Sequence, residues 1–295
     1  MLRSIARLYP SRPPRFHLLA AAFCILALAL LPPATSAHAA TDAATAERLL
    51  QLSGIDQQLD GVGRQLRSGL IDGLLSGAGR SATPSERARL QRVVATVVTG
   101  DRLRTATRDA VALGFEPRHW PALQRWFDSS LGRRIVKAEI AAGSGDPKDG
   151  SLERGATVLQ KAGRERRALL TALVDATRAD QFLAQLTIDI AAGVERGVAS
   201  ATPGRGSLDA PPRAAQLERQ RARIAAGLRS LVLANFAALY APFGNAELRR
   251  YLALLKSPAG RHFNDVTMAA ISAALVTTTT ALGYELPGIR DQANT

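Results

Sequence analysis

The sequence predicts an all-α protein, because three observations agree across its 295 residues. Apolar side chains recur at every third or fourth position in nearly every segment, which is the period of an amphipathic helix. No stretch of any length shows the alternation of apolar and polar residues that marks a half-buried strand. A long motif also occurs twice, 128 residues apart, so we expect two tandem helical repeats packed as a helical bundle.

Residues 1–39 have the composition of a cleaved export signal. Four arginines and no acidic residue accompany an apolar run at residues 18–31, and Ala37-His38-Ala39 has the small-x-small cleavage pattern. At ~1.5 Å per residue this run spans roughly 21 Å as a helix, less than the ~30 Å hydrocarbon core of a bilayer. We therefore predict cleavage near Ala39 by the Sec-type route and a periplasmic or secreted protein.

The first repeat is expected at residues 40–142. Its leucines predict two helices separated by Gly54, which suits a helix end, while Asp56 suits the cap of the next helix. Residues 83–86 (Thr-Pro-Ser-Glu) then form a capping box with proline at the first helical position. Glycine and proline interrupt the pattern at residues 114–117, before the first copy of the repeated motif.

A linker region is expected at residues 143–164 because it opens with glycine, proline and aspartate. The second repeat follows at residues 165–282, and residues 283–295 are expected to form a flexible tail. The duplication predicts a bundle with pseudo-twofold symmetry. Each repeat would bury against the other an apolar face that it cannot cover alone. The sequence leaves open whether the repeats share one core or form two domains.

The repeated motif predicts a tight corner between two helices. Both copies share a serine, a glycine three residues later and an arginine after it: Ser129, Gly132 and Arg133, then Ser257, Gly260 and Arg261. Pro258 favours a helix that starts there with Ser257 as its cap. A glycine costs ~1 kcal/mol inside a helix, so its recurrence predicts that another helix passes close to it. We interpret both serines as structural, since no base stands at a fixed spacing from them.

The motif resembles the hallmark of the domain-of-unknown-function 2059 family. The resemblance lies in two apolar or aromatic residues, one intervening position, Ser, a small residue or Pro, any residue, Gly and a basic residue. It covers both halves, from residues 46–50 to the motif around Ser129, and from Leu173 to the motif around Ser257. The first copy departs from it by a serine in place of the proline. The resemblance implies an exported, all-helical bacterial protein with no established activity, and it assigns no catalytic residue.

The charge of the chain limits its partners. Its formal net charge is +13, and removal of the four signal arginines leaves +9. Only four of the 38 basic residues are lysines, a skew that GC-rich coding explains better than a nucleic-acid surface does. We therefore expect no nucleic-acid partner, while an envelope protein, anionic lipid, another polyanion or a second copy of the chain remains open. The candidate anion patch consists of Arg92, Arg219 and Arg223.

The sequence contains no recognisable catalytic, cofactor-binding or metal-binding constellation. Cys24 lies in the export signal, so the mature chain has no thiol nucleophile, disulfide or cysteine ligand. His119 and His262 have no second histidine near them, which argues against zinc. We therefore expect a non-enzymatic binding or interaction module of the cell envelope. The alternatives are a peripheral binder of anionic membrane through arginine faces, and an enzyme with paired carboxylates.

Overall fold

A computed structural model shows how the helices are arranged. It describes residues 42–76, 83–144, 150–202 and 212–291, which hold helices and no strand. The all-α prediction is confirmed, and the predicted signal at residues 1–39 lies outside the described residues. The helices are α2 (Ala43–Ser53), α3 (Ile55–Ser76), α4 (Pro84–Val97), α5 (Gly100–Gly114), the 3₁₀ turn η1 (Pro117–His119), α6 (Trp120–Phe127), α7 (Ser130–Ser144), α8 (Ser151–Lys161), α9 (Arg164–Thr177), α10 (Ala179–Ala201), α11 (Arg213–Arg219), α12 (Arg221–Leu239), α13 (Asn245–Lys256) and α14 (Pro258–Asp291).

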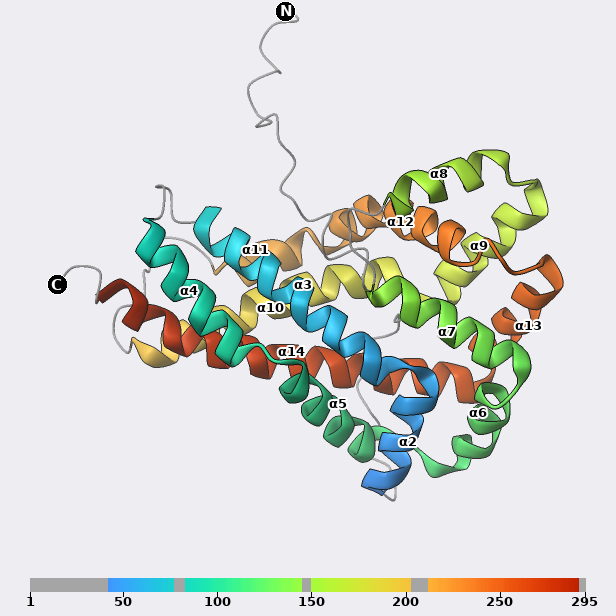
Figure 1. The fold of residues 1–295 in the computed structure, drawn as a ribbon, viewed down its shortest axis with the longest axis horizontal. Coiled ribbons are helices and arrows are strands. Elements are labelled where there is room, and N and C mark those ends of the chain that lie inside the picture. The colour runs from blue at the N-terminus through green and yellow to red at the C-terminus, as the bar shows by residue number, and fades with distance from the viewer. Residues whose placement is uncertain (1–41, 77–82, 145–149, 203–211, 292–295) are drawn as a thin grey trace, which may run out of the picture.

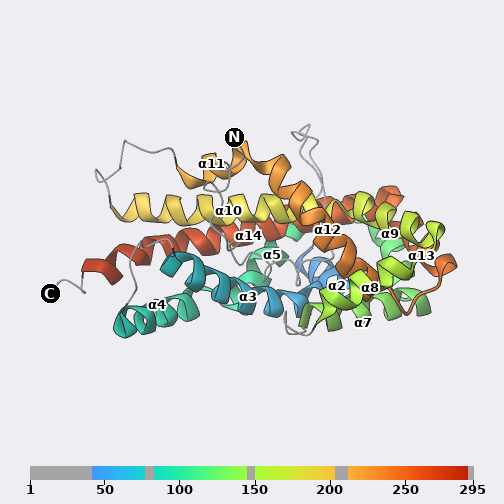
Figure 2. The same cartoon turned by 90° about the horizontal axis from the view of Figure 1, so that it is seen from above.

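The centre of the bundle is a pair of long helices, α10 and α14. They lie side by side along the length of the molecule (Figure 1). Seen from above, α11 lies on one side of this pair, while α3 and α4 lie on the other side (Figure 2). At one end of the molecule α6, α7 and α13 come together (Figure 1). The chain therefore brings both copies of the repeated motif to the same end.

Local signals set several helix boundaries as predicted. Gly54 follows α2 with φ of 74°, in the left-handed region that glycine adopts at little cost. The hydroxyl of Thr83 accepts a hydrogen bond from the N–H of Glu86 at 3.2 Å, and the Glu86 carboxylate accepts one from the N–H of Thr83 at 2.8 Å. Asp56 differs from the prediction, because α3 already begins at Ile55 and Asp56 lies in its first turn.

Two segments are more helical than the sequence predicted. The linker region at residues 143–164 contains α8, which packs against α12. The expected flexible tail at residues 283–295 is helical as far as Asp291, with Pro287 inside the helix. Leu286 in this segment packs against the buried core. Helix α8 begins only after the glycine and proline residues that open the linker region, whereas at Pro287 tertiary packing outweighs the local helix-breaking signal of proline.

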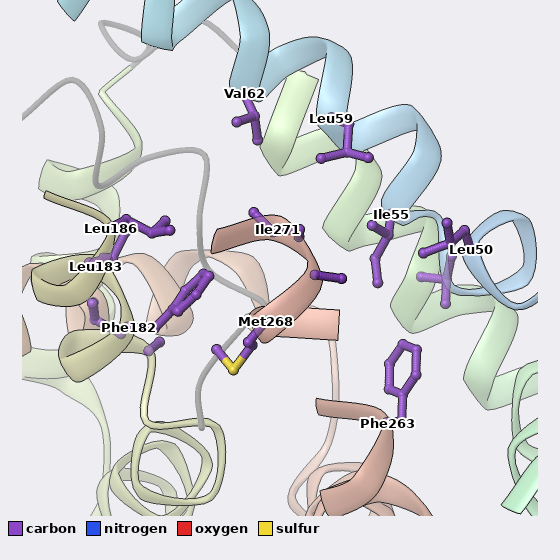
Figure 3. Packing of buried hydrophobic residues seen from close by; sticks show 14 of the residues in the cluster. Leu50, Ile55, Leu59, Val62, Phe182, Leu183, Leu186, Phe263, Met268 and Ile271 are labelled. Carbon is purple, nitrogen blue, oxygen red and sulfur yellow. The ribbon is translucent and has the colours of Figure 1, made fainter. Parts of the chain in front are cut away.

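One cluster of buried apolar side chains runs through both predicted repeats. Leu59 and Val62 of α3 face Leu183 and Leu186 of α10, and Ile271 of α14 lies between them (Figure 3). All five residues belong to the same buried cluster. The described residues therefore form one continuous core.

Helices α10 and α14 approach each other at glycines. Gly193 and Gly197 are four residues apart and share one face of α10. A Cβ atom at Gly197 would overlap the backbone of α14 at the carbonyl oxygen of Thr280, and one at Gly283 would overlap the carbonyl oxygen of Val194. The backbones of the two helices are therefore in direct contact.

Two helices among the described residues are long and apolar enough to cross a membrane by length and composition, α12 and the Pro258–Pro287 part of α14. The apolar window of α14 is 56% buried and that of α12 is 33% buried. Helix α14 is central and contacts α4, α5, α10 and α13, and a helix buried in this way is expected to be apolar.

Candidate functional site

The first copy of the repeated motif forms a hydrogen-bonded corner between α6 and α7. The Ser129 hydroxyl donates to the carbonyl oxygen of Trp126 at 2.6 Å and accepts from the N–H of Gly132 at 3.0 Å. The guanidinium group of Arg133 donates to the carbonyl oxygen of Asp128. These bonds use backbone groups that the ends of the two helices would otherwise leave unpaired.

The second copy forms the same corner between α13 and α14. The Ser257 hydroxyl donates to the carbonyl oxygen of Leu254 at 2.7 Å and accepts from the N–H of Gly260 at 3.0 Å. Arg261 donates to the carbonyl oxygen of Lys256, as Arg133 does at the first corner. Helix α14 begins at Pro258 directly after Ser257, which matches the boundary that the sequence predicted.

Neither corner glycine has room for a side chain. A Cβ atom at Gly132 would overlap the carbonyl oxygen of Trp126, and one at Gly260 would overlap that of Leu254. The sequence predicted that another helix passes close to each glycine. That neighbour is the helix immediately before the corner, so the glycines make the sharp turn possible.

We expect Gly132→Ala and Gly260→Ala each to lower the free energy of unfolding by about 1–3 kcal/mol, the usual cost of overpacking. The better helix propensity of alanine, worth ~1 kcal/mol, acts in the opposite direction and is outweighed. Urea unfolding followed by circular dichroism measures the change. Ser257→Ala is the comparison, since loss of a cap alone costs ~1 kcal/mol. A glycine variant as stable as the wild type would contradict the overlap.

Aromatic side chains hold the two corners together. The rings of Trp126 and Tyr251 stack with centroids 5.8 Å apart and an angle of 11° between their planes. The rings of Phe127 and Phe263 meet edge to face at 5.6 Å. Contacts of this kind add to the apolar area that the rings bury. The end of the molecule seen in Figure 1 is therefore one packed unit with a contribution from each motif copy.

A buried carboxyl group lies beneath these rings. Glu139 of α7 is 3% exposed, and its Oε1 atom accepts hydrogen bonds from the hydroxyls of Tyr240 and Tyr251, both at 2.9 Å. Burial raises the pKa of Glu139 to about 7, although the two hydrogen bonds favour the ionised form. Burial and the nearby Glu139 carboxylate raise the pKa of Tyr251 well above its usual value. Glu139 comes from the first predicted repeat and both tyrosines from the second.

The surroundings of this Tyr–Glu–Tyr cluster enclose it. The rings of Phe236 and Phe243 lie 5.3 and 6.3 Å from the ring of Tyr240. Arg166 donates to the carbonyl oxygens of Tyr240 at 2.5 Å and Phe243 at 2.6 Å. Tyr240 is 1% exposed. The cluster can therefore bind or release a proton and connect helices, but a substrate has no direct access to it.

Glu139 is not among the residues predicted from the sequence, although its position carries a signal. Glu139 follows Ile135 by four positions and Val136 by three, so it lies on the apolar face of that helix. A carboxylate on an apolar face is expected to be buried and to need hydrogen-bond donors. The pattern identifies the carboxylate but does not name the two tyrosines.

His119 and His262, 143 positions apart in the sequence, are neighbours in space. The rings of His119 and His262 lie 4.6 Å apart, and Nε2 of His262 accepts a hydrogen bond from the N–H of Glu116 at 2.8 Å. The prediction that neither has a histidine near it is therefore wrong. Burial is the main cause that lowers the pKa of His119. The part of the chain that the structure describes contains no group of three His, Cys, Asp or Glu side chains able to hold a metal.

The three arginines of the candidate anion patch do not come together. Arg92 lies on α4, Arg219 ends α11 and Arg223 lies in the first turn of α12, and all three are exposed. Figure 2 shows α4 and α11 on opposite sides of α10 and α14. The single patch that the sequence predicted is therefore corrected to separate positions, because helix order along the chain does not fix which side of the bundle a helix covers.

A cavity between α3, α10 and α14 has a volume of about 10 Å³. That is room for about one water molecule. It has no room for a cofactor or substrate. Its walls are mainly apolar: Val62, Leu66, Leu183, Leu186, Thr187, Ile190 and Leu275.

Comparisons with known proteins assign the chain to no group. No family model matches it, no curated protein matches it, and no solved structure matches it. The resemblance to the domain-of-unknown-function 2059 family therefore stays a prediction. The described residues define an all-helical protein with two matching corners and a buried Tyr–Glu–Tyr cluster at one end.

Proposed function

We propose that the protein is an exported, non-enzymatic interaction module of the cell envelope, built from two copies of one helical unit. The matching pair of corners carries this proposal. Each uses a serine, a glycine and an arginine for the same hydrogen bonds, and both lie at one end of the molecule. Repeated helical units commonly build binding surfaces in this way.

The environment of the ionisable groups supports a non-enzymatic role. A general acid or base must reach the substrate atom that exchanges the proton. Glu139 is enclosed by tyrosines, and Nε2 of His262 is engaged by a backbone N–H. Neither residue lines the small cavity between α3, α10 and α14. Packing between helices thus accounts for the environments of Glu139 and His262.

A second candidate function is peripheral binding to anionic membrane. The sequence predicted that membrane binding would use one patch of Arg92, Arg219 and Arg223. The separation of α4, which carries Arg92, from α11 weakens that prediction. Support comes instead from the cations around the two corners, which lie at one end of the molecule.

Export is tested by expression of the full chain, with a tag after Thr295, in a Gram-negative host. We expect a processed protein in the periplasm whose first residue lies near Ala40. The control Leu26→Arg/Leu28→Arg places two charges in the apolar run and is expected to leave uncleaved precursor in the cytoplasm. Uncleaved wild-type protein in the cytoplasm would contradict export.

The interaction role is tested by native mass spectrometry of the processed protein from its own periplasm. We expect a defined oligomer or complex with additional bound mass. Hydrolytic turnover that is lost in Glu139→Gln, Ser257→Ala or His262→Gln would instead identify an enzyme.

A further inference from the structure

We propose that the end of the molecule formed by the two corners binds the surface of an anionic phospholipid bilayer. The proposal deepens the proposed envelope function, and its relevance in the cell rests on export. The helices that form the two corners carry six exposed cations, which we together call the corner surface: Arg125, Arg133, Lys137, Arg250, Lys256 and Arg261.

The cations of the corner surface are free of ion pairs with carboxylates of the described residues. Two neighbouring arginines are neutralised, since Arg134 pairs with Glu247 at 2.6 Å and Arg249 pairs with Glu165. Three carboxylates lie near these cations: Asp128 is exposed at the first corner, and Glu247 and Asp265 interact electrostatically with Arg250 and Arg261. Exposed cations therefore outnumber the carboxylates near them, which favours contact with an external anion.

These cations lie on four helices, α6, α7, α13 and α14, which form the two corners. Arg125 of α6 directly precedes Trp126, and Arg250 of α13 directly precedes Tyr251, whose ring stacks on that of Trp126 at 5.8 Å. On α7, Arg133 and Lys137 are four residues apart and share one exposed face. Hydrogen bonds to backbone carbonyls hold Arg133, and Arg261 at the start of α14, against their corners.

The chemistry of this end favours a bilayer as the partner. The cavity described above lies elsewhere, between α3, α10 and α14, and none of the six cations lines it. A fluid anionic surface needs no matching shape, and each Lys or Arg near it adds attraction. Trp126, which directly follows Arg125, is partly exposed, and an indole ring suits the water–lipid interface.

The test is co-sedimentation of purified residues 40–295, which contain every described helix, with vesicles of phosphatidylglycerol and phosphatidylcholine or of phosphatidylcholine alone. Two triple variants remove the same charge: Arg125→Gln/Lys137→Gln/Arg250→Gln at the corner surface, and Arg92→Gln/Arg219→Gln/Arg223→Gln elsewhere. We expect the corner variant to bind anionic vesicles at least about tenfold more weakly than the control variant does. Salt should weaken wild-type binding.

Three results would overturn the proposal: equal wild-type binding to anionic and neutral vesicles, insensitivity of that binding to salt, or equal losses in the two triple variants. Thermal unfolding checks that both triple variants are folded. If the corner variant is unfolded, the single variants Lys137→Gln and Arg250→Gln replace it. The vesicle assay uses purified protein, so its outcome is independent of the export assay and the two proposals fail separately.

Discussion

The free energy of unfolding is expected to fall by up to about 3 kcal/mol as the pH rises from about 4.5 past 7, through Glu139 alone. The pKa of this carboxyl group is raised from 4.5 to about 7 in the folded protein. The folded state thus holds the proton more tightly than the unfolded state does. This contribution is fully present below pH 4.5 and is lost as the pH passes the folded pKa.

Urea unfolding of the wild type and Glu139→Gln at a series of pH values measures this effect. Glutamine stays neutral and keeps an oxygen that can accept from the hydroxyls of Tyr240 and Tyr251. Other groups titrate in both proteins; burial lowers the pKa of His119, for example, so its contribution is lost as the pH falls. The difference between the two curves therefore reports Glu139. Parallel curves between pH 5 and 8 would show that this carboxyl has an ordinary pKa.

Gly197→Ala is expected to lower the free energy of unfolding by about 3 kcal/mol, at the upper end of overpacking costs. The new methyl group would overlap the carbonyl oxygen of Thr280 and approach the N atom of Tyr284 to 2.6 Å. Both are backbone atoms of α14, so relief requires α10 and α14 to separate along the centre of the bundle. Loss of contact there also affects the buried cluster that both helices share.

Two glycines that lack neighbours serve as controls for this substitution. A Cβ atom at Gly73 of α3 or Gly227 of α12 would meet no atom within 4 Å. Alanine at either position is expected to stabilise the protein by up to ~1 kcal/mol through helix propensity. Thermal or urea unfolding of the three variants therefore gives opposite signs. A stabilised Gly197→Ala variant would mean that α10 and α14 are farther apart than described.

The helix boundaries near strong caps could be read from the sequence because their causes are local. Gly54, residues 83–86 and Pro258 act through hydrogen bonds and backbone angles within a few positions. Arg178 shows the limit of this argument. It stands 124 residues after Gly54 and adopts φ of 47° without being glycine, and its guanidinium group bonds Asp265 of α14 at 3.3 Å. A contact with Asp265, which is distant in the sequence, thus accompanies a backbone conformation that arginine disfavours.

The sequence by itself determined the all-helical class and the positions of both corners in the chain, since helical period and capping depend on residues that are close in the chain. Only the tertiary structure decided that the corners meet, that Glu139 accepts hydrogen bonds from Tyr240 and Tyr251, and that the rings of His119 and His262 are in contact. These contacts join positions more than 100 residues apart. Hydrophobic burial favours many helix arrangements almost equally, and close packing of side chains selects one of them.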